Sequence, residues 1–157
     1  MKRVFGVDPG DKHVGFCEAG MQADGTWEVY APVELAPPTF IRAVTITDPD
    51  LIVLESYRVY SDKAMQHIGS EVPTAEMIGY VKWMRHQCGL SEPIMQSASI
   101  KKPTEGWMDL LGIQHQAVTK RRGGHAKDAE THIYHYLMRT LKVDPVNIKQ
   151  KDEPNAS

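Results

Sequence analysis

The chain has 157 residues, of which 41% are hydrophobic and 24% are charged. This composition is typical of a soluble globular protein with one domain and a real core. Lys and Arg number 18 and Asp and Glu number 20, so the formal net charge is −2, which excludes a uniformly basic nucleic-acid-binding chain and leaves the distribution of charge to decide. We predict a single domain over residues 1–143, followed by a disordered tail over residues 144–157.

The sequence also indicates where the protein acts. No apolar run approaches the ~20 residues that span a bilayer, and the N-terminus leads directly into a strand without the apolar region of a signal peptide. Cys17 and Cys88 stand far apart, without a metal-ligand neighbour at zinc-like spacing. These features predict a cytoplasmic protein with no membrane partner, and they are compatible with either a bacterial cell or a bacteriophage-infected host.

Short apolar segments alternate with turn residues in the first third of the chain. Asp24-Gly25 is a hairpin signal between two of these segments. The pattern predicts strands at residues 3–8, 13–19 and 26–31, a short helix at residues 39–47, and a buried fourth strand at residues 51–55.

The rest of the chain has mainly helical periodicity. Residues 56–72 are polar and weakly patterned, which indicates a loop. Apolar residues recur at helical spacing from Met77 to Cys88 and from Ala126 to Thr140, and Gly89 is a suitable residue after a helix end. We predict helices at residues 73–88, 107–118 and 125–142, and a short fifth strand at residues 92–97. The predicted fold class is therefore α/β, with a mixed five-stranded sheet.

Three acidic residues, far apart in the sequence, lie at the ends of predicted elements. Asp8 and Glu55 each follow a run of apolar strand residues, and Asp128 lies in the first turn of the last helix with His125, about 60° away around the helix axis. Such residues could surround one cavity, where crowded carboxylates repel one another unless a cation neutralises them. Oxygen ligands favour Mg²⁺ or Mn²⁺. Each acid alone could equally be an ordinary turn, strand-end or helix-start residue.

Basic residues are concentrated before the last helix. Between Ile100 and Lys127 six basic residues stand against two acidic ones, a local excess of four positive charges. A solvated basic loop would explain this cluster equally well, but its position directly before Asp128 favours a role in binding phosphate groups.

Taken together, these residues resemble the RuvC-type Holliday-junction resolvases of the ribonuclease H-like superfamily. The likeness rests on Gly6-Val7-Asp8-Pro9-Gly10 with Gly15, on Glu55 after an apolar strand, and on His125-x-x-Asp128-Ala129. It covers about residues 3–141, and Ser99-Ile100-Lys101-Lys102 falls where the family carries a basic segment. The sequence departs from the family at His125, where many members carry Asp, and at residues 72–79, which hold fewer glycines than usual.

The resemblance implies a sheet with helices on both faces and a homodimer that nicks opposed strands of a four-way DNA junction. It implies two Mg²⁺ or Mn²⁺ ions per active site, with Asp8 as the bridging ligand and Glu55 and Asp128 each completing one coordination sphere. His125 would be a further ligand or would orient the attacking water. The DNA-binding residues would be Lys101, Lys102, Lys120, Arg121, Arg122, Tyr57, Arg58 and Tyr60.

The implied DNA contacts divide into two kinds. The basic side chains would hold phosphates without reading sequence. The segment that carries Tyr57 and Tyr60 would reach the junction centre and stack on a base, unless these rings pack on the domain surface instead. His132 lies on the same helix face as Asp128 but roughly 6 Å further along, which favours a surface or dimer role over metal binding.

Three other functions share parts of this pattern. A ribosomal-RNA-processing nuclease of the same superfamily would have the same fold, but its first motif usually lacks Pro9. An actin-like or sugar-kinase-like phosphotransferase also begins with an Asp-x-Gly turn, but it needs two domains. A non-catalytic junction-binding module would gain affinity for DNA by losing its acidic residues, and this chain retains them.

Overall fold

A computed structural model describes residues 2–57, 73–116 and 124–151 of the chain. Seven strands form one mixed sheet, with the order β6-β5-β1-β2-β3-β7 and with β4 paired to β2. The strands are β1 (Lys2–Asp8), β2 (Val14–Met21), β3 (Trp27–Tyr30), β4 (Val33–Leu35), β5 (Leu51–Glu55), β6 (Ile94–Gln96) and β7 (Ile148–Lys151).

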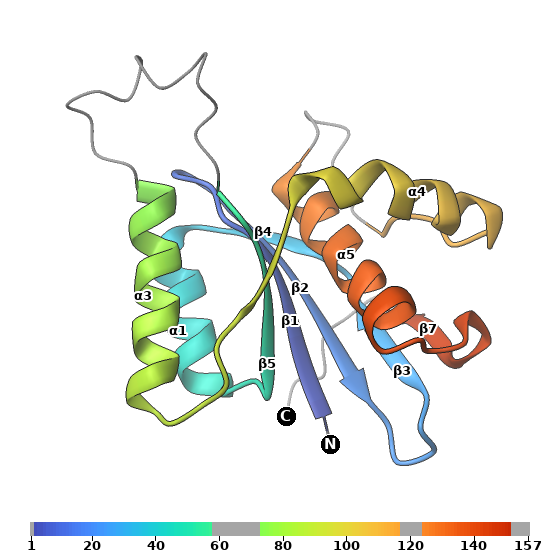
Figure 1. Ribbon diagram of the computed structural model, residues 1–157, viewed down its shortest axis with the longest axis horizontal. Coiled ribbons are helices and arrows are strands. Elements are labelled where there is room, and N and C mark those ends of the chain that lie inside the picture. The colour runs from blue at the N-terminus through green and yellow to red at the C-terminus, as the bar shows by residue number, and fades with distance from the viewer. Residues whose placement is uncertain (1, 58–72, 117–123, 152–157) are drawn as a thin grey trace.

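Helices cover both faces of the sheet, as predicted. Figure 1 shows α1 and α3 on one side and α4 and α5 on the other. None of the helices in the described ranges has both the length and the hydropathy that crossing a bilayer requires. The α-helices are α1 (Pro37–Thr47), α3 (Pro73–Gln87), α4 (Lys101–Leu110) and α5 (His125–His135), and the single-turn or irregular ones are η2 (Ala98–Ile100), η3 (Tyr136–Thr140) and η4 (Pro145–Asn147).

Alternation along the central strands divides the core into two clusters. Successive strand residues point to opposite faces, so Val4 of β1 packs in the cluster beneath α4 and α5, whereas Phe5 and Val7 pack in the cluster beneath α1 and α3. The same alternation in β5 places Val53 on the α5 side and Leu54 on the α3 side. The last residues of β1 and β5 therefore both face α5.

The register of the sheet brings the ends of these strands together. β1 and β5 run parallel, with Val7 beside Leu54, and β6 runs parallel to β5, with Gln96 beside Glu55. The β1–β2 pair is antiparallel and continues through the whole of β1. The carboxyl ends of β1, β5 and β6 therefore meet at one edge of the sheet.

The structure corrects the predicted strand count from five to seven. β4 is too short to show a strand pattern, and β7 falls in the segment that was expected to be disordered. Residues 148–151 instead pair in parallel with β3, and the Ala31 amide donates a further hydrogen bond of 2.9 Å to the Lys151 carbonyl. A polar segment becomes ordered here because the open edge of β3 offers its backbone groups as partners.

Two predicted helices also differ in detail. α4 spans Lys101–Leu110 instead of residues 107–118, and it ends where Gly112 adopts a φ of 69°. The last helix changes to a π-helical turn at Tyr136–Thr140, which rotates the following residues, so Thr140 is exposed although it continues the apolar stripe. Cys88, placed on the buried stripe of α3, is exposed as well.

Candidate metal and active site

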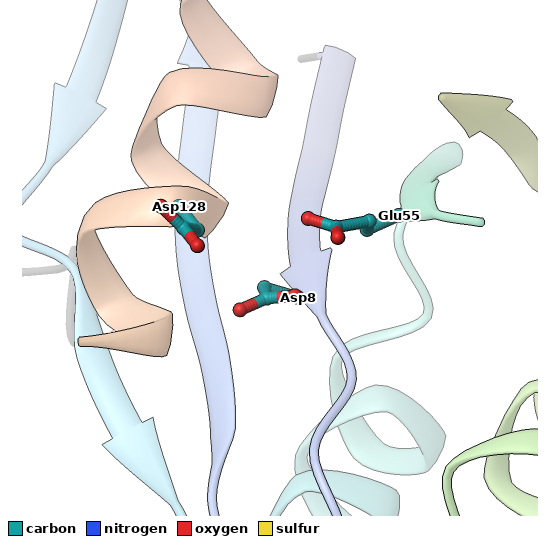
Figure 2. A group of neighbouring side chains, drawn as sticks. All are labelled: Asp8, Glu55 and Asp128. Atoms are coloured by element: carbon teal, nitrogen blue, oxygen red, sulfur yellow. The ribbon is translucent and has the colours of Figure 1, made fainter. Parts of the chain in front are cut away.

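Three carboxylates converge at the carboxyl edge of the central strands. Asp8 ends β1, Glu55 ends β5 and Asp128 lies in the first turn of α5, and one ligand oxygen of each lies within 4.8 Å of the others. Figure 2 shows the three side chains pointing into one space between the strands and the helix. Asp8 is almost buried, with 5% of its surface exposed.

Glycines allow α5 to approach the sheet closely enough to form this cluster. A Cβ atom at Gly6 would lie 2.5 Å from Cγ1 of Ile133 and 2.6 Å from the carbonyl oxygen of Ala129. A Cβ atom at Gly15 would overlap the carbonyl oxygen of His125. Because real Cβ atoms do not approach so closely, these two positions require glycine for the first turn of α5 to lie where it does.

Lys101 lies inside the acidic cluster, although the sequence predicted that it contacts DNA phosphates. Its Nζ atom is 2.6 Å from Oε2 of Glu55 and 2.5 Å from Oδ2 of Asp128. Burial alone would lower the pKa of Lys101, but the hydrogen bonds to Asp128 and Glu55 outweigh it and raise that pKa. The ammonium group contacts two of the three carboxylates and offsets part of their negative charge, as a bound cation would.

His125 contacts the third carboxylate. Its Nδ1 atom lies 2.6 Å from Oδ2 of Asp8, and this hydrogen bond raises the pKa of the imidazole. The pKa of Asp8 is raised chiefly because the carboxyl group is buried, with His125 opposing this shift. The structure therefore places His125 at the site, where its contact is with the carboxylate of Asp8.

His132 is the residue of this site that sequence reasoning placed wrongly. The sequence suggested a surface or dimer role, yet the side chain is fully buried, and its Nε2 atom donates a hydrogen bond of 2.8 Å to Oε2 of Glu55. Burial would raise the pKa of Glu55, but hydrogen bonds from His132 and Lys101 outweigh it and lower that pKa to about 2. The signal was its position four residues after Asp128, on the same face of α5.

The remaining predicted DNA contacts are distributed differently. Lys102 is exposed beside Lys101 at the start of α4, and Tyr57, two residues after Glu55, is 36% exposed. Both side chains are therefore accessible to solvent. Outside the described residues lie Arg58, Tyr60, Lys120, Arg121 and Arg122.

The donor set suits a hard divalent cation. All three acids offer carboxylate oxygens, which Mg²⁺ and Mn²⁺ prefer, and the centre of the cluster already accommodates the positive charge of Lys101. Three carboxylates without such a charge would repel one another. Asp8, Glu55 and Asp128 could therefore hold a metal ion at this edge of the sheet.

Comparisons with known proteins identify the fold. Neither models of protein families nor curated protein sequences match the chain. Among solved structures, RuvC of Thermus thermophilus in complex with a Holliday junction substrate matches with a TM-score of 0.56 at 14% identity, over 88% of this chain and 97% of that one. The fowlpox virus Holliday junction resolvase matches with a TM-score of 0.58 at 13% identity, over 88% of this chain and 99% of that one.

A second fowlpox virus resolvase structure, with substrate Holliday junction DNA, gives a TM-score of 0.55 at 12% identity, over 90% of this chain and 99% of the other. These matches extend over nearly the full length of both partners, so the likeness covers the whole sheet and its helices. The chain therefore has the ribonuclease H-like fold of the RuvC and poxvirus Holliday junction resolvases.

Proposed function

We propose that the protein is a metal-dependent endonuclease that resolves four-way DNA junctions by paired, symmetric nicks. The observation that carries the proposal is the cluster of Asp8, Glu55 and Asp128 within 4.8 Å, in a fold shared with resolvases whose structures include junction DNA. A carboxylate cluster that already contains the ammonium group of Lys101 is suited to a cationic cofactor and unsuited to binding a phosphate directly.

The reaction is hydrolysis of a phosphodiester bond. Water attacks phosphorus in line with the bond to the 3′ oxygen, that bond breaks, and the products carry a 5′-phosphate and a 3′-hydroxyl. Mg²⁺ or Mn²⁺, most simply as two ions, would supply Lewis acidity to lower the pKa of the attacking water and to stabilise the leaving oxygen. Asp8, Glu55 and Asp128 would hold these ions, with Asp8 as a ligand of both.

Two further side chains have roles of their own in this proposal. His125 donates a hydrogen bond to Asp8 and would orient the attacking water. Lys101 would leave Glu55 and Asp128 when a divalent ion replaces its charge, and its ammonium group would then be available to the scissile phosphate. Lys102, Lys120, Arg121 and Arg122 would hold flanking phosphates, so binding should weaken steeply with salt.

The stacking and assembly predictions also belong to this proposal. Tyr57, Arg58 and Tyr60 would reach the junction centre, where an aromatic ring stacks on a base. One chain supplies one acidic cluster among its described residues, so paired nicks at opposed strands require a second copy, and we propose a homodimer that acts in the cytoplasm.

The test is cleavage of a labelled synthetic four-way junction by the purified protein. The reaction is run with Mg²⁺, with Mn²⁺ and with chelator, beside linear duplex, flap DNA and an RNA hairpin. We expect paired symmetric nicks in the junction that disappear with chelator and in Asp8→Asn. Asp109→Asn removes the same charge from an exposed position of α4 and should cleave normally.

Other outcomes would replace the proposal. Tight junction binding without nicks would identify a binding module, and cleavage of the RNA hairpin alone would identify an RNA-processing nuclease. Metal-dependent cleavage that survives in Asp8→Asn would show that the acidic cluster does not carry the reaction.

A further inference from the structure

His132 is a fully buried polar side chain to which the proposed reaction gives no part. Its Nε2 atom lies 2.8 Å from Oε2 of Glu55, and its Nδ1 atom lies 2.7 Å from Oε1 of Gln96. Burying an imidazole costs free energy unless its nitrogens find hydrogen-bonding partners. Both nitrogens are satisfied here, and one of the partners belongs to the acidic cluster.

Gln96 gives this histidine a rigid support. It is the register partner of Glu55 in the parallel β5–β6 pair, so both side chains point toward α5 from neighbouring strands. Its side chain is almost buried, and its backbone carbonyl oxygen accepts a hydrogen bond of 2.7 Å from the backbone amide of Ser56. The imidazole is therefore held between two strands that are themselves fixed to each other.

The contacts on Glu55 fall on one oxygen. Lys101 and His132 both contact Oε2, and within the described part of the chain no hydrogen bond is donated to Oε1. The lysine side chain is 21% exposed, whereas that of His132 is fully buried. When Lys101 moves, His132 remains as the donor that holds the carboxylate in place.

The geometry points to His132, supported by Gln96, as a positioning residue that holds Glu55 in the orientation needed to bind a divalent metal ion with Asp8 and Asp128. This inference rests on the proposed function, because it assumes that the three acids bind metal. Side chains that hydrogen-bond a metal ligand fix its orientation, and their loss typically costs about 10–100-fold in metal affinity.

The protonation state of the ring does not change this role. A neutral imidazole with its proton on Nε2 donates to Glu55 and accepts from the amide nitrogen of Gln96 after rotation of that amide. A charged imidazole donates from both nitrogens, to Glu55 and to Oε1 of Gln96. In either state the Nε2–H group points at Oε2 of Glu55.

Three substitutions separate positioning of Glu55 from a merely structural contact. In His132→Gln the side-chain amide nitrogen occupies the place of Nε2 and keeps a donor for Glu55. In His132→Asn the shorter amide occupies the place of Nδ1, so it keeps the contact with Gln96 and loses the one with Glu55. His132→Leu removes both contacts and retains the volume.

The measurement is the dissociation constant of Mn²⁺ from the full-length protein by titration calorimetry, at a temperature where unfolding curves show each variant to be folded. We expect His132→Gln to bind Mn²⁺ within about threefold of the wild type, whereas His132→Asn and His132→Leu bind about 10–100-fold more weakly. Comparison of Gln with Asn still decides the question if the leucine variant does not fold.

Two results would overturn the inference, and they are distinguishable. If the wild type binds Mn²⁺ and the Asn variant binds it equally well, His132 does not position Glu55, but the proposed function stands. If the wild type binds no Mn²⁺, the metal site assumed by the proposed function fails as well.

Discussion

Replacement of Lys101 by methionine tests whether the ammonium group stands in for a metal cation. The substitution keeps the length of the side chain and removes the charge that contacts Glu55 at 2.6 Å and Asp128 at 2.5 Å. The metal-free variant then holds three neighbouring carboxylates without a compensating charge from this lysine. We expect it to unfold more easily than the wild type in chelator and to be stabilised more by Mg²⁺.

The magnitude follows from the charges around Glu55. Its pKa falls from 4.5 to about 2, and each pKa unit is worth about 1.4 kcal/mol, so its surroundings favour the ionised form by roughly 3 kcal/mol. His132 provides part of this, and the contact with Asp128 adds up to about 1 kcal/mol for a partly exposed pair. Loss of Lys101 should therefore cost about 2–3 kcal/mol, or about 5–10 °C in melting temperature.

The assay is thermal unfolding followed by circular dichroism at neutral pH, in chelator and in Mg²⁺. Lys102→Met is the matched control, because it removes the same charge from the exposed neighbouring position. An unchanged melting temperature of Lys101→Met in chelator would refute the reasoning. Equal stabilisation of variant and wild type by Mg²⁺ would show that the metal does not compete with Lys101.

Three further perturbations test how the site is built. Gly15→Ala should lower the free energy of unfolding by about 2–3 kcal/mol and abolish nuclease activity, because the new Cβ atom would overlap the carbonyl oxygen of His125. Gly79→Ala, in open space on α3, should not lower the free energy of unfolding, and equal denaturation midpoints of the two variants would contradict this prediction. Arg85→Met should lower the free energy of unfolding in urea by about 3–5 kcal/mol, because the buried guanidinium donates to three backbone carbonyls at 2.6–2.9 Å. A loss below about 1 kcal/mol would show that water replaces the guanidinium as the donor. Because the pKa of Glu55 is lower in the folded state, the ionised carboxylate stabilises the fold fully above pH 4.5, and this stabilisation is lost as the pH falls from 4.5 to about 2. The difference in free energy of unfolding between wild type and Glu55→Gln in chelator should therefore shrink over that range, and a constant difference would contradict the pKa shift.

The sequence predicted the central part of the fold because local patterns there agree with tertiary contacts. The strands at Asp8 and Glu55 are marked by apolar runs, and the last helix by apolar residues at helical spacing. It failed at β7, whose residues carry no strand pattern and are ordered by the open edge of β3. The start of α4 was also missed, since the Lys101-Lys102-Pro103 segment reads as loop although proline is well tolerated in a first helical turn.

The three acids, and the prediction that they could surround one cavity, came from the sequence alone. Alternation along a strand and the 3.6-residue period of a helix are local properties, so they place Asp8 and Glu55 at strand ends and His125 and Asp128 in one helical turn. The resemblance to the RuvC-type resolvases added Gly6 and Gly15 as part of a motif. It could not show that both are required by the close approach of α5.

The surroundings of the acids depend on contacts that only the folded chain makes. Lys101 reaches Asp128 across 27 residues of sequence, and His132 reaches Glu55 across 77. A basic residue before a helix and a histidine within a helix each suit many environments, and their partners depend on how α4 and α5 dock on the sheet. Such contacts between elements have no local pattern, because they arise from packing and not from the periodicity of any one segment.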